Sequence, residues 1–341
     1  MKITVKRGLD IKMKGVPNKI IAEGNLSKSF AIKPSDFSNL TPKLLVKEGD
    51  LVKCGSPVFC DKYNDKVIFV SPASGVVDKI IRGEKRRILA VTIISDGKFT
   101  QLNNKVKDFS KLDRKELKTD LLKSGLWPLL RMRPIDIIAR PEDNPKSIFI
   151  SSFDTNPLAP DHDFIMHNKS AEFNAGLELL SMLTDGSVHL QIRKNSDEVF
   201  SNAKNVQIHF VKGPHPSGNV GVQMHEIDPI NKGEVVWYIN PQDVMILGRY
   251  SLTGAYDVKK VISVCGENID SPKYVKTISG SSIESILKGF KIIENSRLIS
   301  GNPLTGQKVD NDSFLGFYHH QVSVLPEGNE YKFFLTEGWL S

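Results

Sequence analysis

Cysteine is scarce in this chain. Its 341 residues include only Cys54, Cys60 and Cys265, which are too few and too irregularly spaced for a disulfide framework or a four-thiolate metal cluster. We therefore predict reduced thiols, a cytoplasmic protein and no metal site.

Long apolar runs are also missing. No stretch approaches the roughly 20 apolar residues that cross a bilayer. The charged start MKITVKRGLD also lacks the apolar segment of a secretory signal. Hydrophobic residues nevertheless make up 40% of the chain, which is enough for separate cores in two or three soluble domains.

Acidic residues are few in the first part of the chain. Residues 1–100 contain 19 Lys and Arg against 10 Asp and Glu, although the whole chain carries a net charge of only +7. This asymmetry indicates an anionic membrane surface, an acidic partner, nucleic acid, or simply a solvated basic surface. Nucleic acid is the weaker interpretation, because the lysines stand singly along strands and no known binding module accompanies them.

The first module, residues 1–100, is predicted to be a β domain. Segments 44–59 and 67–80 alternate apolar and polar residues around glycine turns, as the strands of a flattened barrel do. The pattern V-x-x-G-D-x-V-x-x-G followed by SPASGVV resembles the barrel-sandwich modules of biotinyl and lipoyl carriers. Lys62 superficially matches the modified lysine of such a carrier, but Tyr63 and Asn64 follow it. We therefore expect an unmodified structural barrel, with a stand-alone carrier as the alternative.

The second module, residues 110–255, alternates helix and strand patterns and is predicted to be a Rossmann-like α/β domain. Ser110 and Asp113 form a capping-box-like helix start, and Asn240 is the expected cap of a later helix. Strands are expected at 147–153, 188–193, 206–211 and 235–239, and a helix that ends at Gly186 should bury Leu177, Leu180 and Leu183.

Two loops of this module should meet where ligands bind in such folds, at the carboxyl ends of the strands. They are GPHPSGNVG, residues 213–221, and DTNPLAPDHD, residues 154–163. Prolines and glycines stiffen and bend the first loop, and His215 and His225 add ionisable groups. No G-x-G-x-x-G follows the first strand and no GxxxxGK with Ser or Thr occurs. The fold is therefore predicted to lack a phosphate cradle.

Other polar side chains of the second module are expected at its surface. Arg131, Arg133 and Arg140 fit surface ion pairs, with binding of an anionic group as the alternative. His189 and His209 lie on polar faces of predicted strands, where we expect solvent to cover them.

The third module, residues 257–330, is predicted to be a small β-grasp domain. Ser281 and Glu284 form a capping box for a short helix. His319 and His320 would point to opposite faces of a strand, so they cannot easily share a metal ion and are expected to be structural.

Several motifs in order resemble one family closely along essentially the whole chain, namely the A subunits of the sodium-translocating NADH:quinone oxidoreductases of bacteria. They are KRGLDIKMKGVP, PASGVV with IIRGEKRR, SGLWPLLRMRP, DTNPLAP, GPHPSGNVG, VVWYINPQDV, and SGNPLTG followed by LGFYHHQVSVLPEG. The resemblance implies a peripheral subunit on the cytoplasmic face of the inner membrane, within a complex that uses NADH, flavins, iron–sulfur clusters and quinone.

The chain also departs from related subunits. Its domain order resembles that of the flavin-binding subunit of complex I, but Ser124-Gly125-Leu126-Trp127-Pro128 stands where that subunit has a glycine-rich flavin loop. The bulk of Trp127 would obstruct the backbone approach that a phosphate needs, so we expect neither FMN nor NADH here. The cysteines of related iron–sulfur centres are missing, and the resemblance implies that the chain stops before the family's usual C-terminal helical segment.

Two roles for the subunit follow from this resemblance. In one, it binds quinone, and the residues to test are Trp127, Arg131, His215, Pro216, Gly218 and His225. In the other, it is a scaffold with an emptied cofactor fold whose basic first module docks on acidic subunits or anionic lipid. Neither role assigns a catalytic or metal-binding residue to this chain. A nucleic-acid-binding protein is the remaining alternative.

Overall fold

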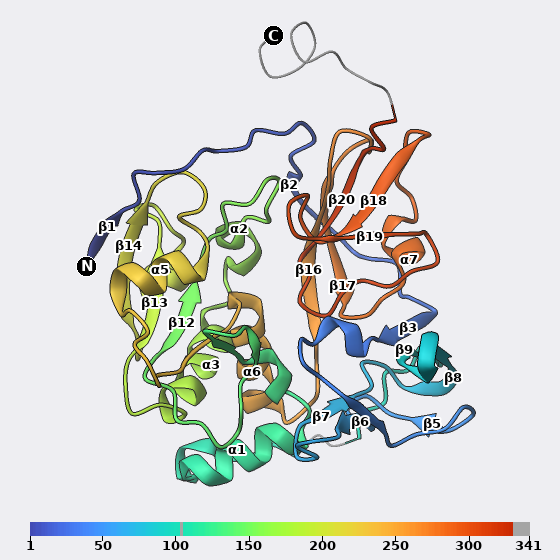
Figure 1. Ribbon diagram of the computed structural model, residues 1–341, viewed down its shortest axis with the longest axis horizontal. Coiled ribbons are helices and arrows are strands. Elements are labelled where there is room, and N and C mark those ends of the chain that lie inside the picture. Colours follow the sequence, from blue (N-terminus) through green and yellow to red (C-terminus); the bar gives the residue numbers. More distant parts are fainter. Residues whose placement is uncertain (103–104, 330–341) are drawn as a thin grey trace, which may run out of the picture.

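The computed structural model describes residues 1–102 and 105–329, whose strands form four sheets. Figure 1 shows the second module on one side of the molecule and the third and first modules on the other. Residue 330, the last of the expected third module, lies outside the described residues. Within those residues, no helix combines the length and apolarity needed to cross a bilayer.

The first module consists of two small sheets. One contains β3 (Ser29–Ile32), β9 (Ile88–Ser95), β8 (Gly75–Arg82) and β5 (Leu51–Val52), and the other contains β4 (Pro42–Leu44), β6 (Pro57–Asp61) and β7 (Ile68–Val70). Val58, Phe59 and Ile93 are fully buried in its core. Because the three central residues of β6 are all buried, both faces of this strand are covered, rather than one as alternation alone would predict. The hairpin tip between β6 and β7 lies against the second module, where Asn64 donates to Glu142 at 3.3 Å.

The first 22 residues leave the first module. β1 (Lys2–Thr4) pairs in parallel with β14 (Gln207–Lys212) of the second module, and β2 (Asn18–Ala22) pairs in parallel with β17 (Lys273–Ile278) of the third. The segment between them runs along one edge of the molecule in Figure 1. Residues 1–100 therefore contribute strands to all four sheets rather than to the barrel alone.

The second module is built on a seven-stranded sheet with the order β1-β14-β13-β12-β15-β10-β11. Its other strands are β10 (Arg131–Arg133), β11 (Ile137–Ile138), β12 (Ile148–Ser151), β13 (Val188–Ile192) and β15 (Val236–Tyr238). The run from β1 to β15 is parallel, and β10 is antiparallel to both of its neighbours. The expected α/β layer is therefore present.

Six helices accompany this sheet within the described residues. They are α1 (Arg114–Lys123), α2 (His162–Met166), α3 (Ser170–Met182), α4 (Glu198–Ser201), α5 (Val220–Ile227) and α6 (Pro241–Thr253). The helix that we expected to end at Gly186 ends at Met182, although Leu177, Leu180 and Leu183 are buried as predicted. Gly248 lets α6 approach α3 closely, because a Cβ there would lie 1.7 Å from the carbonyl oxygen of Glu172.

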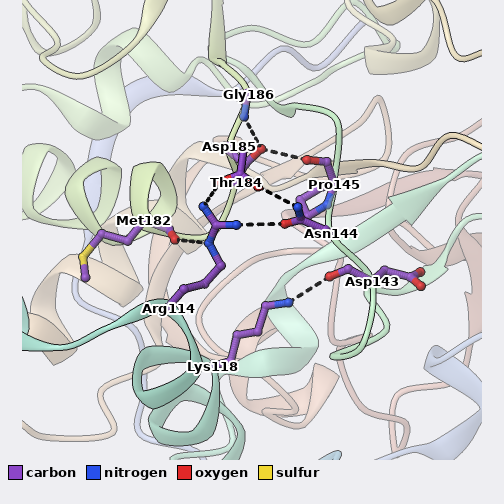
Figure 2. A network of polar contacts seen from close by, with 9 residues as sticks. All are labelled: Arg114, Lys118, Asp143, Asn144, Pro145, Met182, Thr184, Asp185 and Gly186. Atoms are coloured by element: carbon purple, nitrogen blue, oxygen red, sulfur yellow. Dashed lines mark hydrogen bonds and ion pairs between the residues drawn. The ribbon is translucent and has the colours of Figure 1, made fainter.

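Helix α1 begins one turn later than the sequence suggested. Asp113, not Ser110, is the cap: its carboxylate accepts from the Glu116 amide at 2.7 Å, and Glu116 accepts from the Asp113 amide at 3.0 Å. Figure 2 shows Arg114, at the start of α1, donating to the Met182 carbonyl oxygen and to Asp185. The first turn of α1 is thus tied to the C-terminal end of α3.

The third module is a six-stranded sheet with one short helix. Its strands are β16 (Lys259–Cys265), β17, β18 (Ser296–Ser300), β19 (Gln307–Val309), β20 (Gln321–Pro326) and β2, and its helix is α7 (Ile283–Leu287). Ser282, one residue after the expected Ser281, caps α7 by accepting from the Ser285 amide. One apolar core extends through the first and second modules and reaches Tyr274 and Ile278 of the third.

Candidate functional site

The candidate site lies where the strand order of the second module reverses. The chain passes from β12 outward to β13 and β14, and then returns to β15 on the other side of β12. In open α/β sheets, ligands bind in the crevice outside the carboxyl ends of the two strands at such a switch point. Asp154 follows β12 and Asn240 follows β15, so both residues stand at this crevice.

The third module closes the crevice from the other side. What remains is a cleft of about 90 Å³. Its lining residues come from both modules and are Asp154, Pro160, His162, Asn240, Gly301, Asn302, Thr305, Gly306, Tyr318, His319, His320 and Gln321.

Three histidines give the cleft its chemistry. Burial lowers the pKa of His162 and of His319 to about 4, and lowers the pKa of His320 well below its ordinary value. The rings are therefore neutral at pH 7 and offer hydrogen bonds rather than positive charge. His319 Nδ1 lies 2.8 Å from Ser300 Oγ, and His320 Nδ1 lies 3.4 Å from the Gln242 amide nitrogen. Within the described part of the chain, the buried Nδ1 of His162 has no hydrogen-bond partner.

The segment Phe314–His320, here called the hub segment, brings side chains of all three modules together. Asp36 in the 3-10 helix Pro34–Asp36 accepts from the Phe317 amide at 2.9 Å, and Lys260 in β16 donates to the Phe317 carbonyl oxygen at 2.8 Å. The Tyr318 hydroxyl donates to the Pro128 carbonyl oxygen at 2.7 Å. The segment that closes the cleft is thus anchored at several points.

Buried charges from the three modules surround this segment. Burial raises the pKa of Asp36, raises the pKa of Asp243 to about 6 and lowers the pKa of Lys260 to about 8; opposite charges nearby oppose each shift. Each of these residues comes from a different module. None of the three was predicted from the sequence as a site residue. The burial of Lys260 could have been predicted, because it lies on the same face of β16 as Ile262 and Val264, which are buried.

Two of the residues predicted for a quinone site, Trp127 and Arg131, are four positions apart in the chain but have different surroundings. Trp127 is fully buried, and its indole donates to the Ala139 carbonyl oxygen at 2.6 Å. Arg131 stacks on Tyr318, with its guanidinium carbon 4.5 Å from the ring centroid, and pairs with Asp136 at 2.8 Å. Arg131 thus borders the hub segment, whereas Trp127 is a core residue.

His215, Pro216 and Gly218 lie in the loop after β14, which meets the loop after β12 as predicted. Thr155 Oγ1 lies 3.2 Å from His215 Nδ1 and accepts from the Gly218 amide at 3.0 Å. The chain's own N-terminal segment covers this loop, because Asp10 accepts from the His215 amide at 2.9 Å and the Leu9 amide donates to the His215 carbonyl oxygen.

The structure does not gather the six predicted quinone residues into one site. Strands β14 and β10 are separated by β13, β12 and β15, which places the His215 loop roughly 19 Å from Arg131 at ordinary strand spacing. His225 is exposed on α5.

Of the other predictions from the sequence, one is confirmed and others are wrong. Arg131 and Arg133 form the expected ion pairs, both with Asp136. His189 and His209 are not solvated: both are buried, and His189 Nδ1 lies 2.9 Å from His209 Nε2. His319 and His320 precede β20 rather than lie in a strand. Among the described residues, no group of three His, Cys, Asp or Glu side chains is placed to hold a metal ion.

Comparison with known proteins places these observations in a family. Three family models match in order: an NqrA N-terminal barrel-sandwich hybrid domain at residues 3–96, an NqrA second alpha/beta domain at 112–256, and an NQRA C-terminal domain at 261–311.

Relatives match over nearly the full chain. The A subunit of the Na(+)-translocating NADH-quinone reductase of Haemophilus influenzae strain PittGG is 38% identical over 99% of this chain and 76% of its own length. The corresponding subunit of Vibrio atlanticus strain LGP32 is also 38% identical, over 99% of this chain and 75% of its own length.

A more distant likeness is to a chain of an NAD+-reducing nickel–iron hydrogenase. It has 12% identity and a TM-score of 0.46 and covers 64% of this chain and 48% of that one. So distant a likeness carries no inference about activity. The matches along 99% of the sequence identify this chain as a member of the NqrA family, the A subunits of the Na(+)-translocating NADH-quinone reductases.

Proposed function

We propose that this chain is a peripheral subunit of a Na+-translocating NADH:quinone reductase at the cytoplasmic face of a bacterial inner membrane. Within that translocase its role is to hold the other subunits in place, and the isolated chain is not catalytic. NADH, flavins, iron–sulfur clusters and quinone serve the complex, while no flavin or cluster is bound by this chain. The relatives, which are named as A subunits of this reductase, support its membership of the complex.

The small volume of the cleft is the observation that carries the scaffold role. Pockets for small organic ligands usually enclose about 300–1,000 Å³, whereas the crevice at the switch point retains about 90 Å³. The hub segment of the third module lines one wall and is tied to the first module through Asp36 and to the second through the Pro128 carbonyl oxygen. A cleft of this size is too small for a flavin or nicotinamide cofactor, and the residues around it join the modules instead.

The cleft also supports a second candidate, a site for a quinone headgroup. Its walls supply neutral hydrogen-bonding groups, and the buried His162 Nδ1 lacks a partner within the described residues. Arg131 borders the same region through Tyr318. This candidate places the quinone at the switch point rather than at the His215 loop. Because the cleft is small, the hub segment would have to shift to admit the headgroup.

Binding and reconstitution experiments distinguish the two roles. Purified chain is titrated with a short-chain ubiquinone analogue by calorimetry and is also added to membranes that lack their own NqrA. The scaffold role predicts no saturable heat, no flavin absorbance and restored NADH-driven quinone reduction. Saturable binding that His162→Gln abolishes and the exposed control His225→Gln preserves would establish the quinone site instead. Failure to restore reduction would overturn membership of the complex.

A further inference from the structure

The tip of the β8–β9 hairpin carries the densest positive charge of the first module. Five cations, Lys79, Arg82, Lys85, Arg86 and Arg87, fall within nine residues, and all five side chains are exposed. The acidic residues that oppose them are Glu84 within this stretch and Asp78 immediately before it. Within residues 1–102 and 105–329, none of the five cations takes part in an ion pair.

Two apolar side chains flank these cations. Ile81 is 41% exposed and Leu89 is 39% exposed, on opposite strands beside the last ladder pair, Arg82 with Ile88. Isolated exposed apolar residues are common, but these two lie at the ends of the strands that adjoin the cationic turn. Apolar side chains that adjoin a basic cluster are typical of elements that lie in the headgroup region of a membrane.

The backbone of the turn is strained where the cations stand. Lys85 and Arg86 both adopt left-handed conformations, with φ of 51° and 59°, a region that glycine and asparagine occupy more readily. The turn therefore keeps long cationic side chains at two positions where smaller residues would fit the backbone better. Such strain concentrates at functional sites.

We propose that the hairpin tip, residues 79–89, docks on anionic phospholipid headgroups. The inference deepens the proposed peripheral membrane placement by naming the contacting surface. Three of the cations lie in the turn and two in β8 just before it, so a broad anionic surface can contact them together. The exposed side chains of Ile81 and Leu89 beside the cations favour a membrane over an acidic protein surface, because they can insert among the headgroups. Nucleic acid is disfavoured because residues 79–89 contain no aromatic side chain on which a base could stack.

Vesicle sedimentation with the full chain tests this proposal. Phosphatidylcholine vesicles are compared with vesicles that contain about one-third phosphatidylglycerol, at low and at high salt. Binding should require the anionic lipid and weaken as salt screens the charges. The Arg86→Gln and Arg87→Gln double variant should bind roughly 25-fold more weakly, since each cation near an anionic surface is worth about fivefold. Leu89→Ser should weaken binding several-fold without changing the charge.

The matched control removes two exposed cations elsewhere on the same module, Lys62→Gln with Lys66→Gln. It should bind within about twofold of the wild type, because a local site depends little on distant charge. Equal binding to neutral and anionic vesicles would overturn the proposal, as would an equal loss in the control. A tip variant that binds vesicles normally but fails to join membranes containing the other subunits would indicate an acidic protein partner instead. The reconstitution experiment tests complex membership separately.

Discussion

Replacing Lys260 by methionine should weaken the junction of the three modules. Lys260 is buried, donates to the Phe317 carbonyl oxygen and faces the carboxylates of Asp243 and Asp36. Methionine fills a similar volume but leaves two buried carboxylates with less compensation. Removing one partner of a direct buried ion pair costs about 3–5 kcal/mol. Within the described residues Lys260 makes no such direct pair with either carboxylate, and Asp36 keeps its ion pair with Lys33 at 3.4 Å. We therefore expect Lys260→Met to lower the free energy of unfolding by less than about 3 kcal/mol at pH 7, where Lys260 is still largely protonated.

The pH dependence of this loss identifies its cause. The folded-state pKa of Asp243, about 6, lies above the ordinary value of 3.8 because burial disfavours the carboxylate. The native state therefore binds an extra proton between these pH values, and the burial of charged Asp243 above this window costs about 3 kcal/mol. Without Lys260 the pKa rises further. At pH 5 Asp243 is largely protonated, so the loss in the variant should fall to less than half.

Urea unfolding at pH 5 and pH 7 measures both effects. Asp243→Asn in the Lys260→Met background should restore most of the stability at pH 7, because it removes the uncompensated charge. The single variant Asp243→Asn completes this double-mutant cycle. An equal loss at both pH values, or no recovery in the double variant, would refute the electrostatic account of the junction.

Three further predictions concern the second module. Asp113→Ala should cost about 1 kcal/mol in urea unfolding and Ser110→Ala almost nothing, since only Asp113 caps α1; equal losses would contradict this. Trp127→Phe should cost about 1–2 kcal/mol by orphaning the buried Ala139 carbonyl oxygen, and an unchanged melting temperature would speak against that hydrogen bond. Burial lowers the pKa of His209 to about 4 from 6.5, so stability falls as the pH drops through this window. His209→Gln should flatten that fall, and an unaltered pH profile would exclude His209 as its source.

Local signals in the sequence were enough to predict much of the second module. Asn240 caps α6 and Pro241 occupies its first turn because both effects depend only on neighbouring backbone groups. The loops after β12 and β14 meet at Thr155 and His215, as the carboxyl ends of parallel strands must. The capping residues of α1 and α7 differ from those predicted. In both places several neighbouring residues have side-chain oxygens that could cap the helix, and tertiary packing determines which one does.

The pairing of strands that are distant in the sequence could not be predicted from such local signals. Strands β1 and β2 pair directly with β14 and β17, which lie about 200 residues or more further along the chain, and no pattern within ten residues specifies such partners. His189 and His209 were assigned to solvent because each alternates with apolar neighbours, yet they satisfy each other in the core. The cleft was missed because residues of the third module close it, and their position depends on how the modules pack.

Amide hydrogen exchange across the hub segment tests the central claim most directly. The amides of Leu315, Gly316 and Phe317 donate to Ser281, Ser300 and Asp36 respectively, so a closed cleft keeps them protected until the whole molecule unfolds. We predict exchange at the global unfolding rate, unchanged by a short-chain ubiquinone analogue. Exchange through a local opening that the quinone slows or accelerates would show that the cleft admits a ligand, and would contradict the scaffold role.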